Sequence, residues 1–88
     1  MSEPNDEGFA QSTLSNAVEN QIRDGNPSEA KATLNRLMLV GYAREEAIAM
    51  MASVLAQEVQ AIIEQDRAFN LDWYVAALRA LPTLPDAN

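Results

Sequence analysis

Glu58 is the residue whose type and position could most readily support chemistry. Plotted at about 100° per residue, it lies between Val54 and Ile62, inside the apolar arc of a predicted helix. A carboxylate there must be paired, hydrogen-bonded or protonated, because burying it alone is very costly. We interpret Glu58 as a structural anchor; a solvated edge position and a functional acid are the alternatives. Its candidate partners are Tyr42, Tyr74, Trp73 and an arginine.

The composition removes most other routes to catalysis. The chain has no histidine and no cysteine, which excludes thiol chemistry, disulfides and zinc sites built from those ligands. The side chain that most often transfers protons near neutral pH is therefore missing, and no Asp-x-Asp-x-Asp-Gly calcium loop occurs. We expect no catalytic residue, no metal, no cofactor, and a protein that is not an enzyme.

Negative charge is concentrated towards the ends of the chain. The net charge is -7, from 13 acidic and 6 basic residues, and residues 1–11 contain three acids and no base. No basic stripe is present, so neither nucleic acid nor an anionic membrane is an expected partner. The N-terminus lacks the features of a signal peptide, and no apolar run approaches the roughly 20 residues of a membrane span. We expect a cytoplasmic protein.

The spacing of apolar residues predicts an all-α protein with one domain, residues 12–82. The preceding segment 1–11 is expected to be flexible and acidic, and the tail 83–88 to be flexible. The short connections favour a compact four-helix array around a long third helix. The predicted helices lie near residues 12–24, 27–40, 44–66 and 71–81.

Two helix ends carry strong local signals. Asn26 is expected to cap the second helix, with Pro27 at its first position. Gly41 is expected to end that helix in a left-handed conformation, with Tyr42 packing back on Leu37.

The fourth helix is expected to begin at an Asn70 cap, with Phe69 packing on Tyr74 one turn inside the helix. Its expected buried stripe comprises Leu71, Tyr74, Val75 and Leu78.

Trp73 and Met50 are the candidate interaction residues. Trp73 and Tyr74 are adjacent in the predicted helix, so their side chains point in different directions. With Tyr74 buried, Trp73 is expected to be partly exposed. Met38, Met50 and Met51 are interpreted as core residues, with Met50 nearest the edge of the apolar arc. Because the third helix is apolar around most of its circumference and its neighbours are short, a homodimer is expected to cover it.

Two resemblances bear on the fold. Residues 34–47 resemble the first two helices of a ubiquitin-associated domain, a helix followed by a Met-Gly-Phe/Tyr turn. Here Val40 replaces the methionine and the third helix is much longer, so we interpret this hairpin as convergent. Residues 26–82, with Asn26-Pro27 and the closing run from Trp73 to Pro82, resemble small bacterial all-helical proteins of uncharacterised activity, which implies a helical fold and a bacterial origin.

Together these features favour a small non-enzymatic protein–protein interaction module, with a homodimer as one form. The alternative is a small-molecule-binding protein or an enzyme with a pocket near Glu58. A carboxyl group with a raised pKa inside a pocket would favour this alternative, whereas a flat apolar patch would favour the interaction module.

Overall fold

The computed structural model describes the backbone of residues 6–85 and the side chains of residues 12–85. It confirms the all-α prediction, since the described backbone contains no strand. The first helix begins six residues earlier than predicted, and residues 1–5 and 86–88, which belong to the two segments expected to be flexible, lie outside the described part. The helices are α1 (Asp6–Asp24), α2 (Ser28–Leu39), α3 (Arg44–Gln65) and α4 (Leu71–Ala80).

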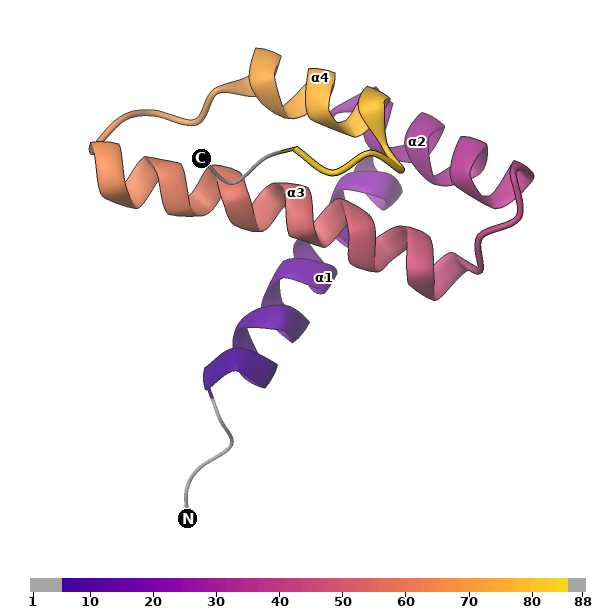
Figure 1. Ribbon diagram of the computed structural model, residues 1–88, viewed down its shortest axis with the longest axis horizontal. Helices are drawn as coiled ribbons and strands as arrows, with labels where there is room; N and C mark the ends of the chain where they lie inside the picture. The colour runs from indigo at the N-terminus through magenta and orange to yellow at the C-terminus, as the bar shows by residue number, and fades with distance from the viewer. Residues whose placement is uncertain (1–5, 86–88) are drawn as a thin grey trace.

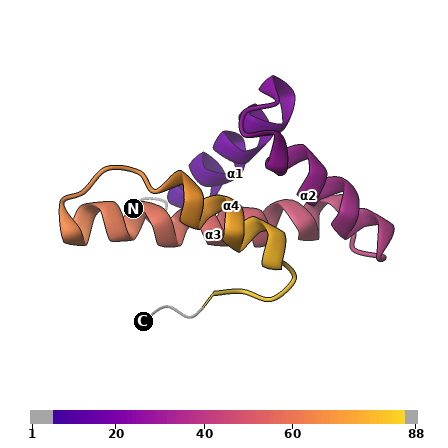
Figure 2. The ribbon, with the colours of Figure 1, turned by 90° about the horizontal axis from the view of Figure 1, so that it is seen from above.

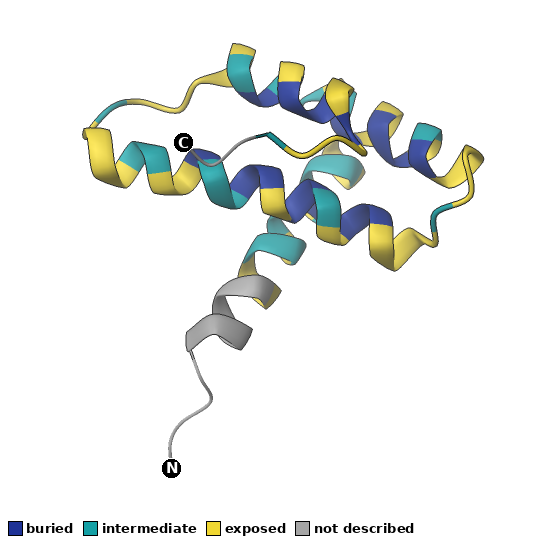
Figure 3. Ribbon diagram, in the orientation of Figure 1, coloured by how far each residue is buried: buried dark blue, intermediate teal, exposed yellow. Residues whose placement is uncertain are grey.

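The long helix α3 is central and contacts each of the other three helices. Helix α2 lies along its first half, α4 folds back across it beside α2, and α1 crosses it at a steep angle (Figures 1 and 2). The buried sides of these helices face one another (Figure 3). The residues on these sides are mostly apolar and form the core. The largest core side chains are Val18, Leu37, Met51, Val54, Tyr74, Leu78 and Leu81.

By length and composition, α3 is the one helix in the described part of the chain that could cross a membrane. Its buried side chains face the other helices, as in the core helix of a soluble protein. The last of these buried residues is Glu58, so the final two turns of α3 lie beyond the core. There two apolar side chains, Val59 and Ile63, are exposed.

The prediction that Asn26 caps α2 is wrong. Pro27 has φ -76° and ψ 153°, an extended conformation, and takes the N-cap position itself. The helix therefore begins at Ser28, one residue later than the cap signal implied, and Asn26 lies outside it. The Pro27 carbonyl oxygen accepts a 3.0 Å hydrogen bond from the Ala30 N–H, so the helix starts without a side-chain cap.

The end of α2 has the predicted conformation. The Tyr42 N–H donates to the Leu37 carbonyl oxygen and the Gly41 N–H to that of Met38, each at 3.1 Å. This pair of bonds is a Schellman motif, and it requires Gly41 to have a positive φ, here 116°. The turn reverses the chain, so that α3 can run back against α2.

We expect Gly41→Ala to lower the free energy of unfolding by about 1 kcal/mol, because a Cβ disfavours positive φ. No neighbouring atom lies within 4 Å of the added Cβ position, so the loss comes from the backbone alone. Urea denaturation of both proteins measures it. An equal or higher midpoint for Gly41→Ala would contradict the left-handed turn.

The start of α4 also matches the prediction. The Asn70 side-chain oxygen accepts a 3.0 Å hydrogen bond from the Trp73 N–H, which makes Asn70 the N-cap. The Phe69 and Tyr74 rings meet edge to face, with their centroids 5.4 Å apart. Leu71, however, is 50% exposed rather than buried; it lies in the first turn of α4, whose buried residues begin at Tyr74.

Candidate functional site

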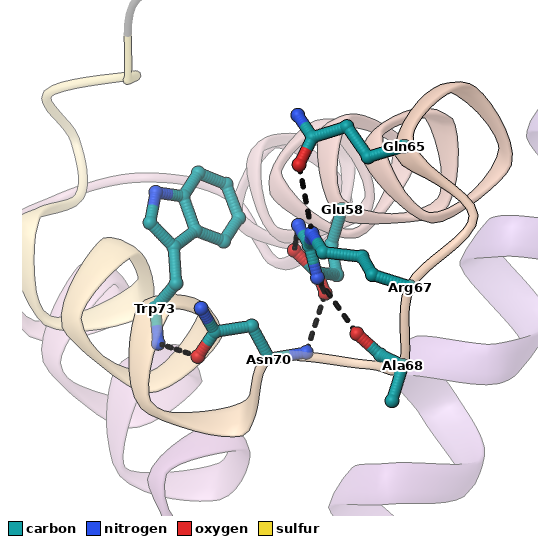
Figure 4. A network of polar contacts seen from close by, with 6 residues as sticks. All are labelled: Glu58, Gln65, Arg67, Ala68, Asn70 and Trp73. Carbon is teal, nitrogen blue, oxygen red and sulfur yellow. Dashed lines mark hydrogen bonds and ion pairs between the residues drawn. The ribbon is translucent and has the colours of Figure 1, made fainter.

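The predicted burial of Glu58 is confirmed, and its partner is an arginine. Its side chain is 1% exposed, and Arg67 binds it through the two terminal nitrogens of its guanidinium (Figure 4). The Nη1–Oε2 distance is 2.8 Å and the Nη2–Oε1 distance 3.0 Å. The backbone N–H of Asn70 donates a third bond, 2.6 Å long, to Oε2. Both carboxylate oxygens therefore have donors.

Arg67 holds the connection between α3 and α4 in place as well. Its guanidinium also donates to the Ala68 carbonyl oxygen at 2.8 Å, and its Nε donates to the Gln65 side-chain oxygen at 3.2 Å (Figure 4). Glu58 on α3 thus binds both Arg67 in the connecting loop and the Asn70 N–H at the start of α4. We call these three residues the Glu58 network.

The hydrogen bonds from the Arg67 guanidinium hold the pKa of Glu58 below its ordinary value. Burial opposes this effect, and the Asn70 N–H adds to it. Glu58 is therefore ionised at neutral pH. A general acid needs a raised pKa and a free oxygen, and this carboxylate has neither, so the arrangement fits a structural role.

A second polar cluster joins α2 to the C-terminal end of α4. Arg36 donates to the carbonyl oxygens of Leu81 at 2.6 Å, Leu78 at 3.1 Å and Arg79 at 3.3 Å. The last carbonyls of a helix have no partner within the helix, so this guanidinium supplies donors at the end of α4, where the Leu78 oxygen also accepts from the Leu81 N–H at 3.2 Å. Nearby, Arg79 forms an exposed ion pair with Glu29.

Helix α1 is tied to α4 by one buried hydroxyl group. The Tyr74 hydroxyl donates a 2.7 Å hydrogen bond to the Gln21 side-chain oxygen. Burial raises the pKa of Tyr74, and the bond to Gln21 opposes this. The hydroxyl is therefore protonated near neutral pH, as its donor role requires.

Exposed apolar side chains occur at both ends of α3. At the α2–α3 turn Leu39 is 87% exposed, beside the exposed Met38 and Val40. At the opposite end Ile63 is 74% exposed and borders a groove of about 300 Å³ between α1 and α3. We call it the α1–α3 groove. It is lined by Leu14, Ala56, Val59, Gln60, Ile63 and Glu64.

The residues predicted to mediate interactions lie elsewhere. Trp73 and Met50 are half-buried and pack against the core, and neither lines the groove. Met38 was expected in the core but is exposed, because it lies in the last turn of α2, off the side that carries the buried Leu34 and Leu37. Arg36 and Arg67 were not singled out by the sequence, because nothing in their spacing indicates which distant carbonyls or carboxylates they bind.

Among the residues whose side chains are described, no group of three or more carboxylates is arranged to hold a metal ion. No protein-family model, curated protein sequence or solved structure matches the chain. The site must therefore be interpreted from its own geometry.

Proposed function

We propose that this chain is a non-enzymatic protein–protein interaction module of the cytoplasm, and that the α1–α3 groove is its docking surface. The observation that carries the proposal is the exposure of Ile63. This large apolar side chain lies on the central helix, beyond the last buried residue, and borders a mostly apolar groove. Apolar surface of this kind is typical of sites that a partner covers.

The shape and lining of the groove support a helical partner. Its aliphatic lining consists of Leu14 from α1 and Ala56, Val59 and Ile63 from α3. An amphipathic helix fits such a groove by inserting apolar residues spaced three or four apart. The polar groups of the lining, Gln60 and Glu64, are hydrogen-bonded to each other at 2.8 Å, which leaves the apolar part free for contact.

The alternative of a small-molecule or catalytic pocket near Glu58 has less support. Both oxygens of Glu58 are bonded to Arg67 or Asn70, and its pKa is lowered rather than raised. Glu58 is not among the residues that line the described groove. A homodimer is one form that the proposed interaction function could take, since a second copy of the chain could cover the same surface.

Affinity capture from native cytosol tests the docking surface. We expect immobilised wild-type protein to enrich specific proteins, and Ile63→Gln to lose them, because a polar group would then enter the apolar groove. Leu39→Gln is the matched control, since it changes another strongly exposed apolar residue, at the α2–α3 turn far from the groove. Quantitative mass spectrometry compares the three eluates.

Two outcomes would contradict the proposal. If the wild-type protein enriched nothing above an inert resin, the chain would not act as an interaction module under those conditions. If Ile63→Gln and Leu39→Gln retained the same proteins as wild type, the docking surface would lie outside the groove.

A further inference from the structure

The charges around the α1–α3 groove define the kind of partner it accepts. We propose that the groove binds a cationic amphipathic helix. The apolar side chains of this partner helix would contact Val59 and Ile63, and one of its lysine or arginine residues would lie beside Glu64. This inference rests on the proposed docking function and adds the chemistry of the partner. It follows from which charges on the described surface are already paired and which are not.

Most of the basic side chains already bind acidic or carbonyl groups of the same chain. Four arginines form ion pairs with carboxylates, and Arg36 binds the carbonyl oxygens at the end of α4. Lys31, on α2, is the remaining base of the sequence. The ion-paired arginines are Arg23, Arg44, Arg67 and Arg79.

Acidic side chains without an ion pair remain, and two of them lie at the end of α3. Glu64 lines the groove and Asp66 caps the helix, both exposed. The last turn of α3 contains no base, so these charges add to the partial negative charge of the helix C-terminus. The nearest base in sequence, Arg67, is bound to Glu58. The groove is therefore mostly apolar, with the negative charge of Glu64 in its lining and that of Asp66 at the end of the same helix.

A second copy of this chain fits that charge pattern less well. A two-fold dimer across the groove would bring Glu64 and Asp66 of both copies to one interface, while Arg67, the nearest arginine in the sequence, is already paired with Glu58. Like charges placed together in an interface oppose association. A partner helix carrying lysine or arginine removes this repulsion and replaces it with attraction.

Binding of designed helical peptides to the full chain tests the inference. One peptide, about 16 residues long, carries leucine at helical i, i+3, i+4 and i+7 spacing and lysine elsewhere; its match carries glutamate in place of lysine. We expect the lysine peptide alone to bind, with amide chemical-shift changes in NMR spectra centred on Ala56 to Ile63. We expect Ile63→Gln to weaken its binding about tenfold or more.

Charge variants separate local recognition from the overall negative charge. We expect Glu64→Gln combined with Asp66→Asn to weaken lysine-peptide binding several-fold at low salt, and this loss to shrink at high salt. Glu45→Gln, at the opposite end of α3, should leave binding unchanged. Equal binding of the two peptides, or equal effects of the Glu45 and Glu64 changes, would overturn the inference.

Sedimentation equilibrium then identifies the competing occupant. A wild-type dimer that Ile63→Gln converts to a monomer would assign the groove to a second copy and overturn the cationic helix. If cellular capture depends on Ile63 but the lysine peptide does not bind, the docking function stands and the partner chemistry proposed here is wrong. If neither depends on Ile63, the docking function fails as well.

Discussion

Arg67→Met should destabilise the fold strongly at neutral pH, and more than Glu58→Ala does. Removal of the guanidinium leaves a carboxylate that is 1% exposed with the Asn70 N–H as its main donor, and an unpaired buried charge is among the costliest defects in a protein. In Glu58→Ala the remaining Arg67 is partly exposed and can be hydrated. We expect Glu58→Ala to lower the free energy of unfolding by about 1–3 kcal/mol, largely because it leaves hydrogen-bond donors unpaired.

The pH dependence of stability should change sign between the two proteins. In the wild type the folded-state pKa of Glu58 lies below its unfolded value, so its stabilisation is complete above about pH 4.3 and is lost as the pH falls through the folded value. Without Arg67, burial outweighs the Asn70 bond and raises the folded pKa. The variant should then lose stability as the pH rises through that value.

Urea denaturation at several pH values between 7.5 and 5 measures both effects. We expect the gap between wild type and Arg67→Met to narrow on acidification. Adding Glu58→Gln to Arg67→Met should restore part of the lost stability, since it removes the buried charge. A double variant as unstable as Arg67→Met, or a gap independent of pH, would show that Arg67 stabilises the loop by its packing instead.

Local signals in the sequence predicted the features that depend on a few neighbouring residues. Gly41 ends α2 because its two hydrogen bonds close within six residues, and only a residue tolerant of positive φ completes them. Asn70 caps α4 through a bond three residues away, and Phe69 reaches Tyr74 one turn on. Glu58 could be predicted as buried and paired because a polar residue on an apolar arc has few other options.

The features that the sequence did not predict depend on tertiary geometry, which the spacing of residues does not encode. The Asn26 signal failed because Pro27 is extended, which moved the cap by one residue. Leu71 and Ile63 lie on apolar arcs, yet both are exposed, because periodicity shows which face of a helix is apolar but not how far its neighbours extend along it. The partners of Arg36 lie more than 40 residues away in the sequence.

Arg36→Met should release the C-terminal end of α4 from α2. Three carbonyl oxygens lose a charged donor. The Leu78 oxygen keeps the Leu81 N–H as a donor, whereas the oxygen of the buried Leu81 loses its 2.6 Å bond where water replaces a hydrogen bond poorly. Hydrogen bonds to charged groups contribute about 1.5–3 kcal/mol each, and they are not additive. We expect a loss of about 2–4 kcal/mol in the free energy of unfolding, since methionine keeps the apolar stem but donates nothing.

Hydrogen exchange locates that loss within the molecule. Amide protons of α4 should exchange faster in Arg36→Met, while those of the α1–α3 contact change less, because the missing bonds involve only the end of α4. Arg79→Met is the matched control: its ion pair with Glu29 is exposed, so its removal should cost less than about 1 kcal/mol. The loss of stability in Arg36→Lys should lie between those of Arg36→Met and Arg79→Met, since an ammonium group cannot reach three carbonyls in the same planar arrangement. Equal stabilities for Arg36→Met and Arg79→Met, with α4 exchange unchanged, would mean that water satisfies these carbonyls as well as Arg36 does.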